Sequence, residues 1–477
     1  MSSRDPSIAP ELPQTLEWLN LAAPLRMAQL HGRVCALGFI NAGSAWSLQR
    51  LHDLGQIQAR FGERLQVVAI HVPRFDHERD ARRVAKRLNR QGFTFPIAHD
   101  LDWQAWQHYG IDAWPSIVLI DGQGRIRDRI VGDGALRELD VRVAALCAEG
   151  GLAATSTDAI ELLRNSEPSL PLRFPIGLAV DRQYLYVADS GHHRVLECDH
   201  AGRVLRQFGS GGAGFIDGPM ELAAFSHPHG LCLHRDVLYV ADSGNHAVRR
   251  IQLRTGDVDT LCGVGRAGAP SEGPVANARS LTLDQPRAVA LSGDALLVAC
   301  AGDNRIWNYD LGRDVMTLAA GSGALDVLDG IGREAAFAEP VSLAVVQQVL
   351  YVCDAAGSAI RTLNTRSGQV TTLIGVGMWE HGYDDGVRSQ ARLQHPQAIA
   401  LDPGAPMLWI ADSGNDQLRT LRLGGGELTT HALPQRLHAP CGLAVADGIV
   451  WIADTDAHAV MRLDTHSGAL RHVPVGE

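Results

Sequence analysis

The chain has 477 residues, 45% of them hydrophobic, which is enough for two or three domains with substantial cores. Its formal net charge of −10 argues against a surface that binds nucleic acid or an anionic membrane. No apolar run approaches the ~20 residues of a membrane-spanning helix, and no signal-peptide pattern begins the chain. We therefore expect a cytoplasmic protein whose eight scattered cysteines stay reduced.

Residues 1–30 are expected to form a polar, proline-containing lead, and residues 31–150 then alternate between strand and helix patterns. Strands are predicted at residues 34–40, 65–72, 95–98, 117–121 and 125–130. Helices are predicted at residues 44–61, 76–91, 103–109 and 135–147. This alternation predicts an α/β domain.

The order of these elements resembles a thioredoxin fold. Trp114-Pro115, just before a strand, matches the cis-proline position of that family, and Ser44 and Ser47 stand where its two redox cysteines would lie. Hydroxyls cannot replace the attacking thiolate and the resolving thiol, so Ser44, Ser47 and Pro115 should mark a degenerate redox site. Ser44 is then expected to cap the first helix. The alternative is a serine nucleophile, for which the closest histidine in the sequence, His52, lies two turns along the same helix.

Residues 151–172 have the composition of a linker, and a repeated phrase of about 55 residues fills residues 173–477. Each copy begins at a proline, namely Pro175, Pro228, Pro286, Pro340, Pro396 and Pro440. Each then reaches a second anchor, namely Asp189, Asp242, Cys300, Asp354, Asp412 and Asp454. Every copy contains four strand-length runs separated by Gly, Asp and Asn, so the six copies predict a six-bladed β-propeller.

The copies that begin at Ala188, Ala241 and Ala411, the second reading Ala-Asp-Ser-Gly-Asn-His-Ala-Val-Arg, resemble NHL repeats. Asp-Ser-Gly-Asn is turn chemistry, so we interpret the repeated Asp as a scaffold residue and the pair Asp384-Asp385 as a solvated turn.

A thioredoxin-like module followed by such repeats resembles the NHL repeat-containing protein 2 family, including its bacterial members, over almost the whole chain. An inter-blade phrase that begins with Asp-Gly adds to this resemblance before three of the repeats, at Asp217, Asp329 and Asp385. Two features of the family are not found: its cysteine motif, and the C-terminal β domain of its animal members. The resemblance implies a cytosolic scaffold whose two facing domains form an interaction cleft.

The residue after each repeat proline should start the innermost strand and lie near the central channel. These residues are Ile176, His229, Arg287, Val341, Gln397 and Cys441, of which the polar four are our binding candidates. Some six-bladed, peptide-amidating lyases resemble this arrangement and bind zinc through such histidines. Here only His229 fits, with Cys441 as a possible soft partner, so we expect no metal and no cofactor. Arg287 would make the channel an anion site.

The combination of a binding architecture with a lost dithiol predicts a non-catalytic interaction protein whose partner is another protein. The alternative is an enzyme of one of two kinds. The first is a hydrolase or lyase that uses the propeller channel. The second is a relative of the thiol–disulfide oxidoreductases with residual activity through a remote cysteine such as Cys35, which lies in the first strand.

Overall fold

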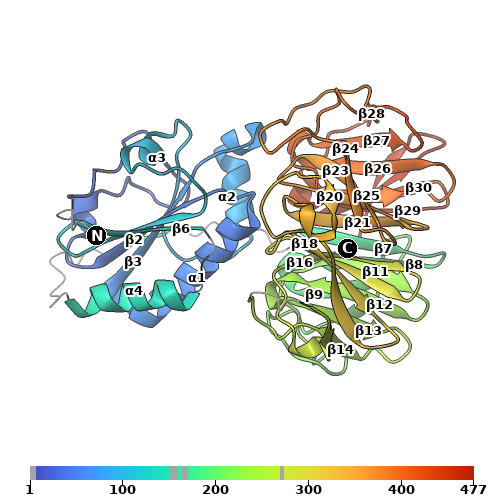
Figure 1. The fold of residues 1–477 in the computed structure, drawn as a ribbon, viewed down its shortest axis with the longest axis horizontal. Helices are drawn as coiled ribbons and strands as arrows, with labels where there is room; N and C mark the ends of the chain where they lie inside the picture. The colour runs from blue at the N-terminus through green and yellow to red at the C-terminus, as the bar shows by residue number, and fades with distance from the viewer. Residues whose placement is uncertain are drawn as a thin grey trace. The chain divides into compact units, whose positions relative to one another are not determined.

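The computed structural model describes residues 7–132, 134, 136–149, 160–163, 170–268 and 273–476. The chain divides into two units, Met1–Pro168 and Ser169–Glu477, which Figure 1 shows as an α/β domain and a β-propeller. None of the helices in the described ranges is long and apolar enough to cross a membrane.

The first unit is built on one six-stranded sheet with the strand order β1-β4-β3-β2-β5-β6. Its strands are β1 (Glu17–Trp18), β2 (Val34–Ile40), β3 (Leu65–His71), β4 (Ile97–His99), β5 (Ser116–Ile120) and β6 (Ile126–Val131). Its helices are α1 (Ala45–Phe61), α2 (Ala81–Asn89), α3 (Gln104–His108) and α4 (Leu136–Glu149). Strand β2 pairs in parallel with β3 and antiparallel with β5, which is the thioredoxin-like arrangement that the sequence predicted.

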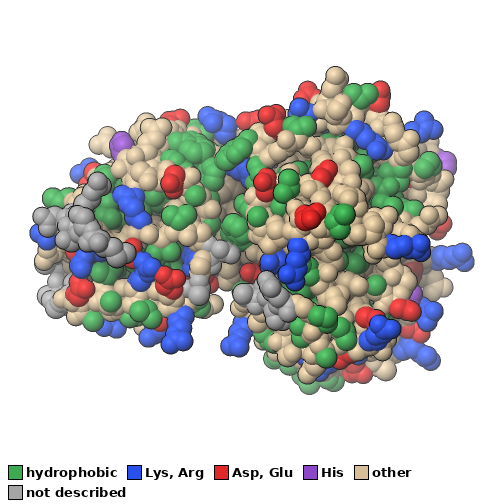
Figure 2. All heavy atoms as spheres, viewed as in Figure 1, with side chains coloured by type: hydrophobic (Ala, Val, Ile, Leu, Met, Phe, Trp, Pro, Cys, Tyr) green, Lys and Arg blue, Asp and Glu red, His purple; other side chains and the backbone are tan. Residues whose placement is uncertain are grey.

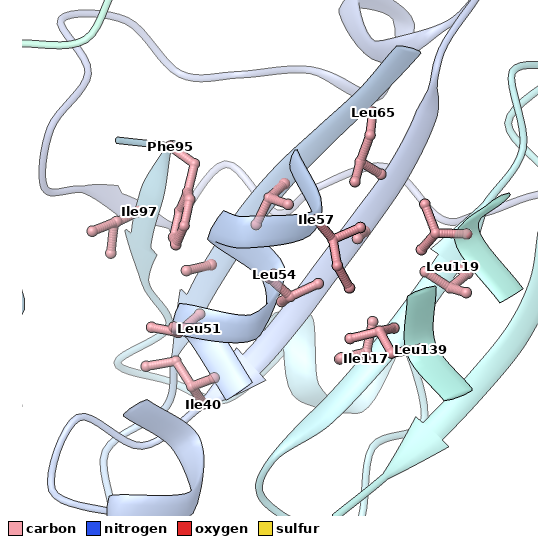
Figure 3. Packing of buried hydrophobic residues seen from close by; sticks show 14 of the residues in the cluster. Ile40, Leu51, Leu54, Ile57, Leu65, Phe95, Ile97, Ile117, Leu119 and Leu139 are labelled. Atoms are coloured by element: carbon pink, nitrogen blue, oxygen red, sulfur yellow. The ribbon is translucent and has the colours of Figure 1, made fainter. Parts of the chain in front are cut away.

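Each face of this sheet carries its own hydrophobic core. On one face, Leu51 and Leu54 of α1 and Leu139 of α4 pack against Val67 and Leu119 of the sheet, as Figure 3 shows in part. The predicted helix at 76–91 is divided into a 3-10 turn (Asp76–Arg79) and α2, because the Asp80 side chain accepts a hydrogen bond from the Arg82 N–H and caps a new helix.

The segment 7–30 packs into the second core and is not the separate polar lead that the sequence suggested. Leu12, Leu16 and Leu25 are buried there, and β1 adds to the edge of the sheet beside β4. Within the predicted linker, Leu162 bridges to Leu21 and also packs on this core. The rest of that linker, residues 151–159 and 164–169, lies outside the described residues.

The second unit consists of six four-stranded antiparallel sheets, the blades. Blade 1 consists of β7 (Pro175–Val180), β8 (Tyr184–Asp189), β9 (Arg194–Asp199) and β10 (Val204–Phe208). Blade 2 consists of β11 (Pro228–His234), β12 (Val237–Asp242), β13 (Ala247–Gln252) and β14 (Val258–Cys262). The main strands of blade 3 are β16 (Pro286–Ser292), β17 (Ala295–Cys300), β18 (Arg305–Asp310) and β19 (Val315–Ala320). Those of blade 4 are β21 (Pro340–Val346), β22 (Val349–Asp354), β23 (Ala359–Asn364) and β24 (Gln369–Ile374). Blade 5 consists of β25 (Ala398–Leu401), β26 (Met407–Asp412), β27 (Gln417–Arg422) and β28 (Leu428–Thr430). Blade 6 consists of β29 (Pro440–Ala446), β30 (Ile449–Asp454), β31 (Ala459–Asp464) and β32 (Leu470–Val473). Two-residue strands β15 (Val275–Ala276) and β20 (Gly330–Ile331) extend the outer edges of blades 3 and 4.

The constant spacing between proline and anchor reflects the first hairpin of each blade. In five blades the proline that begins the innermost strand pairs directly with the anchor that ends the second strand, as Pro228 does with Asp242. In blade 5, where the spacing is longer, the register is kept by Ala398 opposite Ala411.

The ring closes between blades 6 and 1, and each blade takes its four strands from one continuous stretch of the chain. The Thr455 hydroxyl donates to the Pro175 carbonyl at 2.7 Å, across the seam. The inner strands approach so closely that a Cβ atom on Gly442 would lie 1.6 Å from the Ile176 carbonyl oxygen. None of the described residues before 175 adds a strand to blade 1.

Neighbouring blades are also joined by one repeated hydrogen bond, which we call the blade staple. The acceptor is the side chain of the fourth residue after each anchor, which has a φ of +48° to +56°. The donor is the backbone N–H of the residue just before the repeat proline of the next blade, which has a φ of +47° to +60°. The acceptor–donor pairs are His193–His227, His246–Gln285, Asn304–Glu339, Ser358–His395, Asp416–Ala439 and His458–Phe174. The histidine of the repeat phrase is therefore a hydrogen-bond acceptor between blades.

The staple formed by His193 predicts a pH dependence of stability. Its Nδ1 accepts the His227 N–H at 3.1 Å only while that nitrogen is unprotonated, and burial, with the nearby Arg173 and His192 charges, lowers the pKa of His193. Because the unfolded chain then binds the proton more readily, the stabilisation is complete above the ordinary histidine pKa of about 6.5 and is lost as the pH falls from there to the lowered value.

We expect the stability of His193→Asn to fall less between pH 7 and pH 5 than that of the natural chain. An asparagine amide accepts the same hydrogen bond in blade 3 and does not titrate. Thermal unfolding measured across this range tests the expectation, with His466→Asn at an exposed histidine as the control. An unchanged pH dependence in His193→Asn would show that this imidazole does not act as such an acceptor.

Candidate functional site

The serines of the predicted degenerate redox site lie where β2 leads into α1. Ser44 caps the helix, because its hydroxyl accepts the Ser47 N–H. The Ser47 side chain is fully buried, and its hydroxyl accepts the Asn41 N–H at 3.1 Å. Pro115 precedes β5, whose Ser116 pairs with Phe39 near the end of β2. Both hydroxyls therefore accept backbone N–H groups at the two positions where we predicted the lost redox cysteines.

Next to this site lies a cluster of buried polar side chains that the sequence analysis did not predict. The Asn41 amide donates to Glu78 at 2.6 Å, and His71 and His99 approach each other with their Nδ1 atoms 2.9 Å apart. Burial lowers the pKa of His71 to about 3, so this imidazole is neutral at physiological pH. The sequence did contain a signal for the histidine pair, because the parallel neighbours β3 and β4 both end in a histidine.

Seven of the eight cysteines lie in environments that disfavour the thiolate. Cys35 is buried in the middle of the sheet, and burial raises its pKa to about 12. Burial also raises the pKa of the thiols of Cys147, Cys198, Cys232, Cys262, Cys300 and Cys353. Since thiol exchange proceeds through the thiolate, these residues are poor nucleophiles at neutral pH.

In the propeller, the repeated Asp is part of a buried ion network rather than of a turn alone. In blades 2, 4 and 5 a fully buried arginine, seven residues after the anchor, bridges the anchor and the Asp of the inter-blade phrase. The three networks are Asp242–Arg249–Asp217, Asp354–Arg361–Asp329 and Asp412–Arg419–Asp385, with N–O distances of 2.6–3.1 Å. Asp384 and Asp385 are both exposed, as expected of a solvated turn, but Asp385 also pairs with Arg419 at 2.6 Å. The sequence analysis missed this pairing and the three arginines.

Blade 3 replaces this network as a unit. Cys300 stands at the anchor, Trp307 takes the place of the arginine, and Val275 takes the place of the inter-blade Asp. All three pack in or against one hydrophobic cluster. This substitution is physically reasonable, because a buried ion network can be exchanged for apolar groups, whereas the loss of one ionic partner is costly.

The channel candidates line one cavity at the centre of the propeller. Its wall includes all six of these residues, Ile176, His229, Arg287, Val341, Gln397 and Cys441, and it leaves about 90 Å³ for the centres of water-sized molecules. Arg287 Nη1 lies 2.7 Å from His229 Nε2, and Nη2 donates to the Gln285 side chain at 3.0 Å. The Gln397 amide donates to His395 at 3.3 Å, and the Cys441 thiol donates to the Ala439 carbonyl at 3.2 Å.

Among the residues that line the cavity, His229 and Cys441 are of types that ligate metals. His229 contacts Arg287, and Cys441 is contributed by a strand of blade 6. Across the described parts of the chain, no three His, Cys, Asp or Glu side chains are grouped so that they could hold an ion. The arrangement is instead that of a mixed polar and apolar pocket with one cationic wall.

Comparisons with known proteins extend over both units. The NHL repeat family matches residues 225–251, within blade 2. NHL repeat-containing protein 2 of Gallus gallus is 27% identical over 527 residues, covering 100% of this chain and 72% of that protein. Protein SUPPRESSOR OF QUENCHING 1, chloroplastic, of Arabidopsis thaliana is 30% identical, covering 98% of this chain and 48% of that protein. Thiol-disulfide oxidoreductase YkuV of Bacillus subtilis is 24% identical, covering 29% of this chain and 94% of that protein.

Proposed function

This chain is a thioredoxin-like NHL-repeat protein, similar along its whole length to NHL repeat-containing protein 2, and from this premise we propose that it is a non-catalytic interaction protein. The observation that carries the proposal is the use of both dithiol positions for backbone hydrogen bonds. Ser44 caps α1, and the buried Ser47 accepts from Asn41. A site built in this way keeps the fold in place but has no sulfur with which to exchange.

Residual thiol chemistry through Cys35 is disfavoured by the same reasoning. Its side chain is 1% exposed and its pKa is raised to about 12, so a disulfide substrate would meet neither access nor a thiolate.

Three loops between blades supply the binding surface in this proposal. They connect β10 to β11, β19 to β21 and β24 to β25, and each contains the Asp that a buried arginine holds in place. Each also exposes large apolar side chains, namely Ile216 and Leu222, Leu328 and Ile331, and Val376, Tyr383 and Val387. A loop fixed in this way loses little conformational entropy when it binds, which favours a protein partner.

Charge does not single out another kind of partner. Figure 2 shows acidic and basic side chains interspersed with hydrophobic ones on the face in view. Because the net charge is −10, a general attraction to nucleic acid is disfavoured, and local apolar contacts from the loops are the more plausible source of affinity.

The test is capture of partners from an extract of the source cells with the intact chain, followed by quantitative mass spectrometry. Three variants each change one loop: Ile216→Ser with Leu222→Ser, Leu328→Ser with Ile331→Ser, and Val376→Ser with Val387→Ser. We expect at least one of them to lose a specific partner by about 10-fold or more, the effect of removing an apolar anchor. Leu205→Ser, at an exposed leucine on the outer strand β10, is the matched control. Full retention of every partner by all three loop variants would contradict the proposal.

A further inference from the structure

Blade 3 differs from its neighbours at the residue three positions after the anchor. In blades 2 and 5 this residue is an asparagine, and its amide donates to the anchor carboxylate, at 2.7 Å for Asn245 and 2.8 Å for Asn415. The same two amides also donate to backbone carbonyl groups of the preceding inter-blade loops, at Gly214 and Gly382. In blade 3 the residue is Asp303. A carboxyl group can donate as these amides do only when it carries a proton.

The Asp303 carboxyl group is buried, and only one of its oxygens is hydrogen-bonded. The residue is 8% exposed, and Oδ2 accepts a hydrogen bond from Trp307 Nε1 at 3.0 Å. Oδ1 is buried and has no hydrogen-bond partner among the described residues. The anchor Asp242, by contrast, has a donor on each oxygen, the Ser226 N–H on Oδ1 and Arg249 on Oδ2. A buried carboxyl group with a bare oxygen is costly when ionised, so the geometry at Asp303 favours the protonated form.

The charged and titratable groups around Asp303 do not offset its burial. Arg305 approaches Oδ2 only to 3.9 Å, and its Nη2 donates to a backbone carbonyl. The buried thiol of Cys300 supplies no cation, and Asp284 adds a second carboxyl group. Burial raises the pKa of Asp303 to about 7, and the charge of Asp284 adds to this rise, whereas the Trp307 hydrogen bond and Arg305 oppose it.

Asp284 lies against the turn that contains Asp303. The Gly302 N–H donates to the Asp284 carbonyl at 3.1 Å, and a Cβ atom on Gly302 would lie 2.3 Å from Asp284 Oδ1. This oxygen is also buried without a hydrogen-bond partner. His246 Nδ1 lies 3.4 Å from it, but that nitrogen accepts the Gln285 N–H of the blade staple and therefore has no proton to donate. Both carboxyl groups thus lack a donor where the inter-blade segment packs against the turn.

We propose that this part of blade 3 is a pH-sensitive switch: Asp303 holds a proton at acidic pH and, once ionised, repels Asp284 and loosens the segment before β16 from the turn after β17. The proton lets Oδ1 donate, as the amides of Asn245 and Asn415 do, and ionisation places a charge in a buried site. In the unfolded chain this carboxyl group has the ordinary aspartate pKa of about 3.9. Because the folded chain holds the proton more tightly, the stabilisation is complete below about pH 4 and is lost as the pH rises through about 7.

The variant Asp303→Asn tests the switch, because its amide accepts from Trp307, supplies a donor and does not titrate. Thermal unfolding of the full chain and of this variant is compared from pH 5 to pH 9. We expect the variant to unfold about 3 °C or more above the natural chain at pH 9, and this gap to shrink as the pH falls to 5. Asp294→Asn, at an exposed aspartate of the same blade, is the control and should give no pH-dependent gap.

Hydrogen–deuterium exchange, corrected for the intrinsic effect of pH on the exchange rate, locates the change. Peptides that cover residues 280–290 and 300–306 should lose protection by about 5-fold or more between pH 6 and pH 9 in the natural chain, but not in Asp303→Asn. Asp284→Asn removes the second carboxylate and should move the midpoint of this loss to lower or higher pH than in the natural chain. If Asp303→Asn does not fold, an unchanged midpoint in Asp284→Asn overturns the inference.

Two further results would overturn it. The first is an equal pH dependence of unfolding in the natural chain and in Asp303→Asn. The second is stabilisation at pH 9 by added calcium or potassium chloride that Asp303→Asn abolishes, because the two carboxyl groups would then hold a cation instead of releasing a proton. Neither substituted residue belongs to the three loops of the partner-capture experiment, so the two tests succeed or fail separately.

Discussion

Replacing Arg361 by methionine is expected to lower the free energy of unfolding by about 3–5 kcal/mol, the usual cost of removing one member of a buried ion pair. Arg361 and Asp354 are both fully buried, and their side chains meet at 3.1 Å. The guanidinium also donates to the Ala336 and Leu328 carbonyl groups and to Asp329. The variant would leave two carbonyl groups and Asp354, whose pKa burial already raises to about 7, without these donors. Chemical denaturation followed by tryptophan fluorescence measures the effect.

The outer partner of the same network provides the control. Asp329 has a side chain that is 47% exposed, so Asp329→Asn should cost about 1 kcal/mol or less. The double variant Arg361→Met with Asp354→Asn should cost less than the sum of its single changes, because no charge is then stranded. A loss below about 1 kcal/mol for Arg361→Met would show that this network contributes little to the fold.

Replacing both Ser44 and Ser47 by cysteine should give the chain thiol–disulfide exchange activity that we expect the natural chain to lack. Position 44 lies at the start of α1, where the helix dipole stabilises a thiolate. Position 47 is buried one turn further along, which suits a resolving thiol. We expect a disulfide between positions 44 and 47 on oxidation, visible by mass spectrometry, and catalysis of insulin reduction.

Single variants separate this effect from a general gain of thiols. Ser44→Cys alone and Ser47→Cys alone each lack the second sulfur, so neither should catalyse turnover. A folded double variant that forms no disulfide between positions 44 and 47 would show that these serines do not occupy the dithiol positions.

The architecture of the propeller was predictable because its periodicity is strong. The proline and the anchor recur at a nearly constant spacing, and that spacing is the length of the hairpin in which Pro228 pairs with Asp242. Likewise, the serine pair and Pro115 could be placed from the order of strands and helices alone. The predicted channel residues His229, Arg287, Gln397 and Cys441 line one cavity, since the first residue after each proline always faces the axis.

The ion networks were not predictable from local pattern. Arg249 and Asp217 lie 32 residues apart in the chain, and only the folded blade brings them within 2.7 Å. Segment 7–30 was misread for a related reason. Leu12 and Leu16 have the four-residue spacing of a helix face, yet no α-helix forms there, so their burial depends on the tertiary surface they cover.

The account depends most on the claim that this thioredoxin-like domain cannot exchange thiols. The direct measurement is insulin disulfide reduction by the natural chain with dithiothreitol, compared with the reaction without protein. We predict equal rates, because both serines are committed to the backbone and burial raises the pKa of the nearby Cys35 to about 12. A faster rate with the natural chain that is lost in Cys35→Ser would contradict the account.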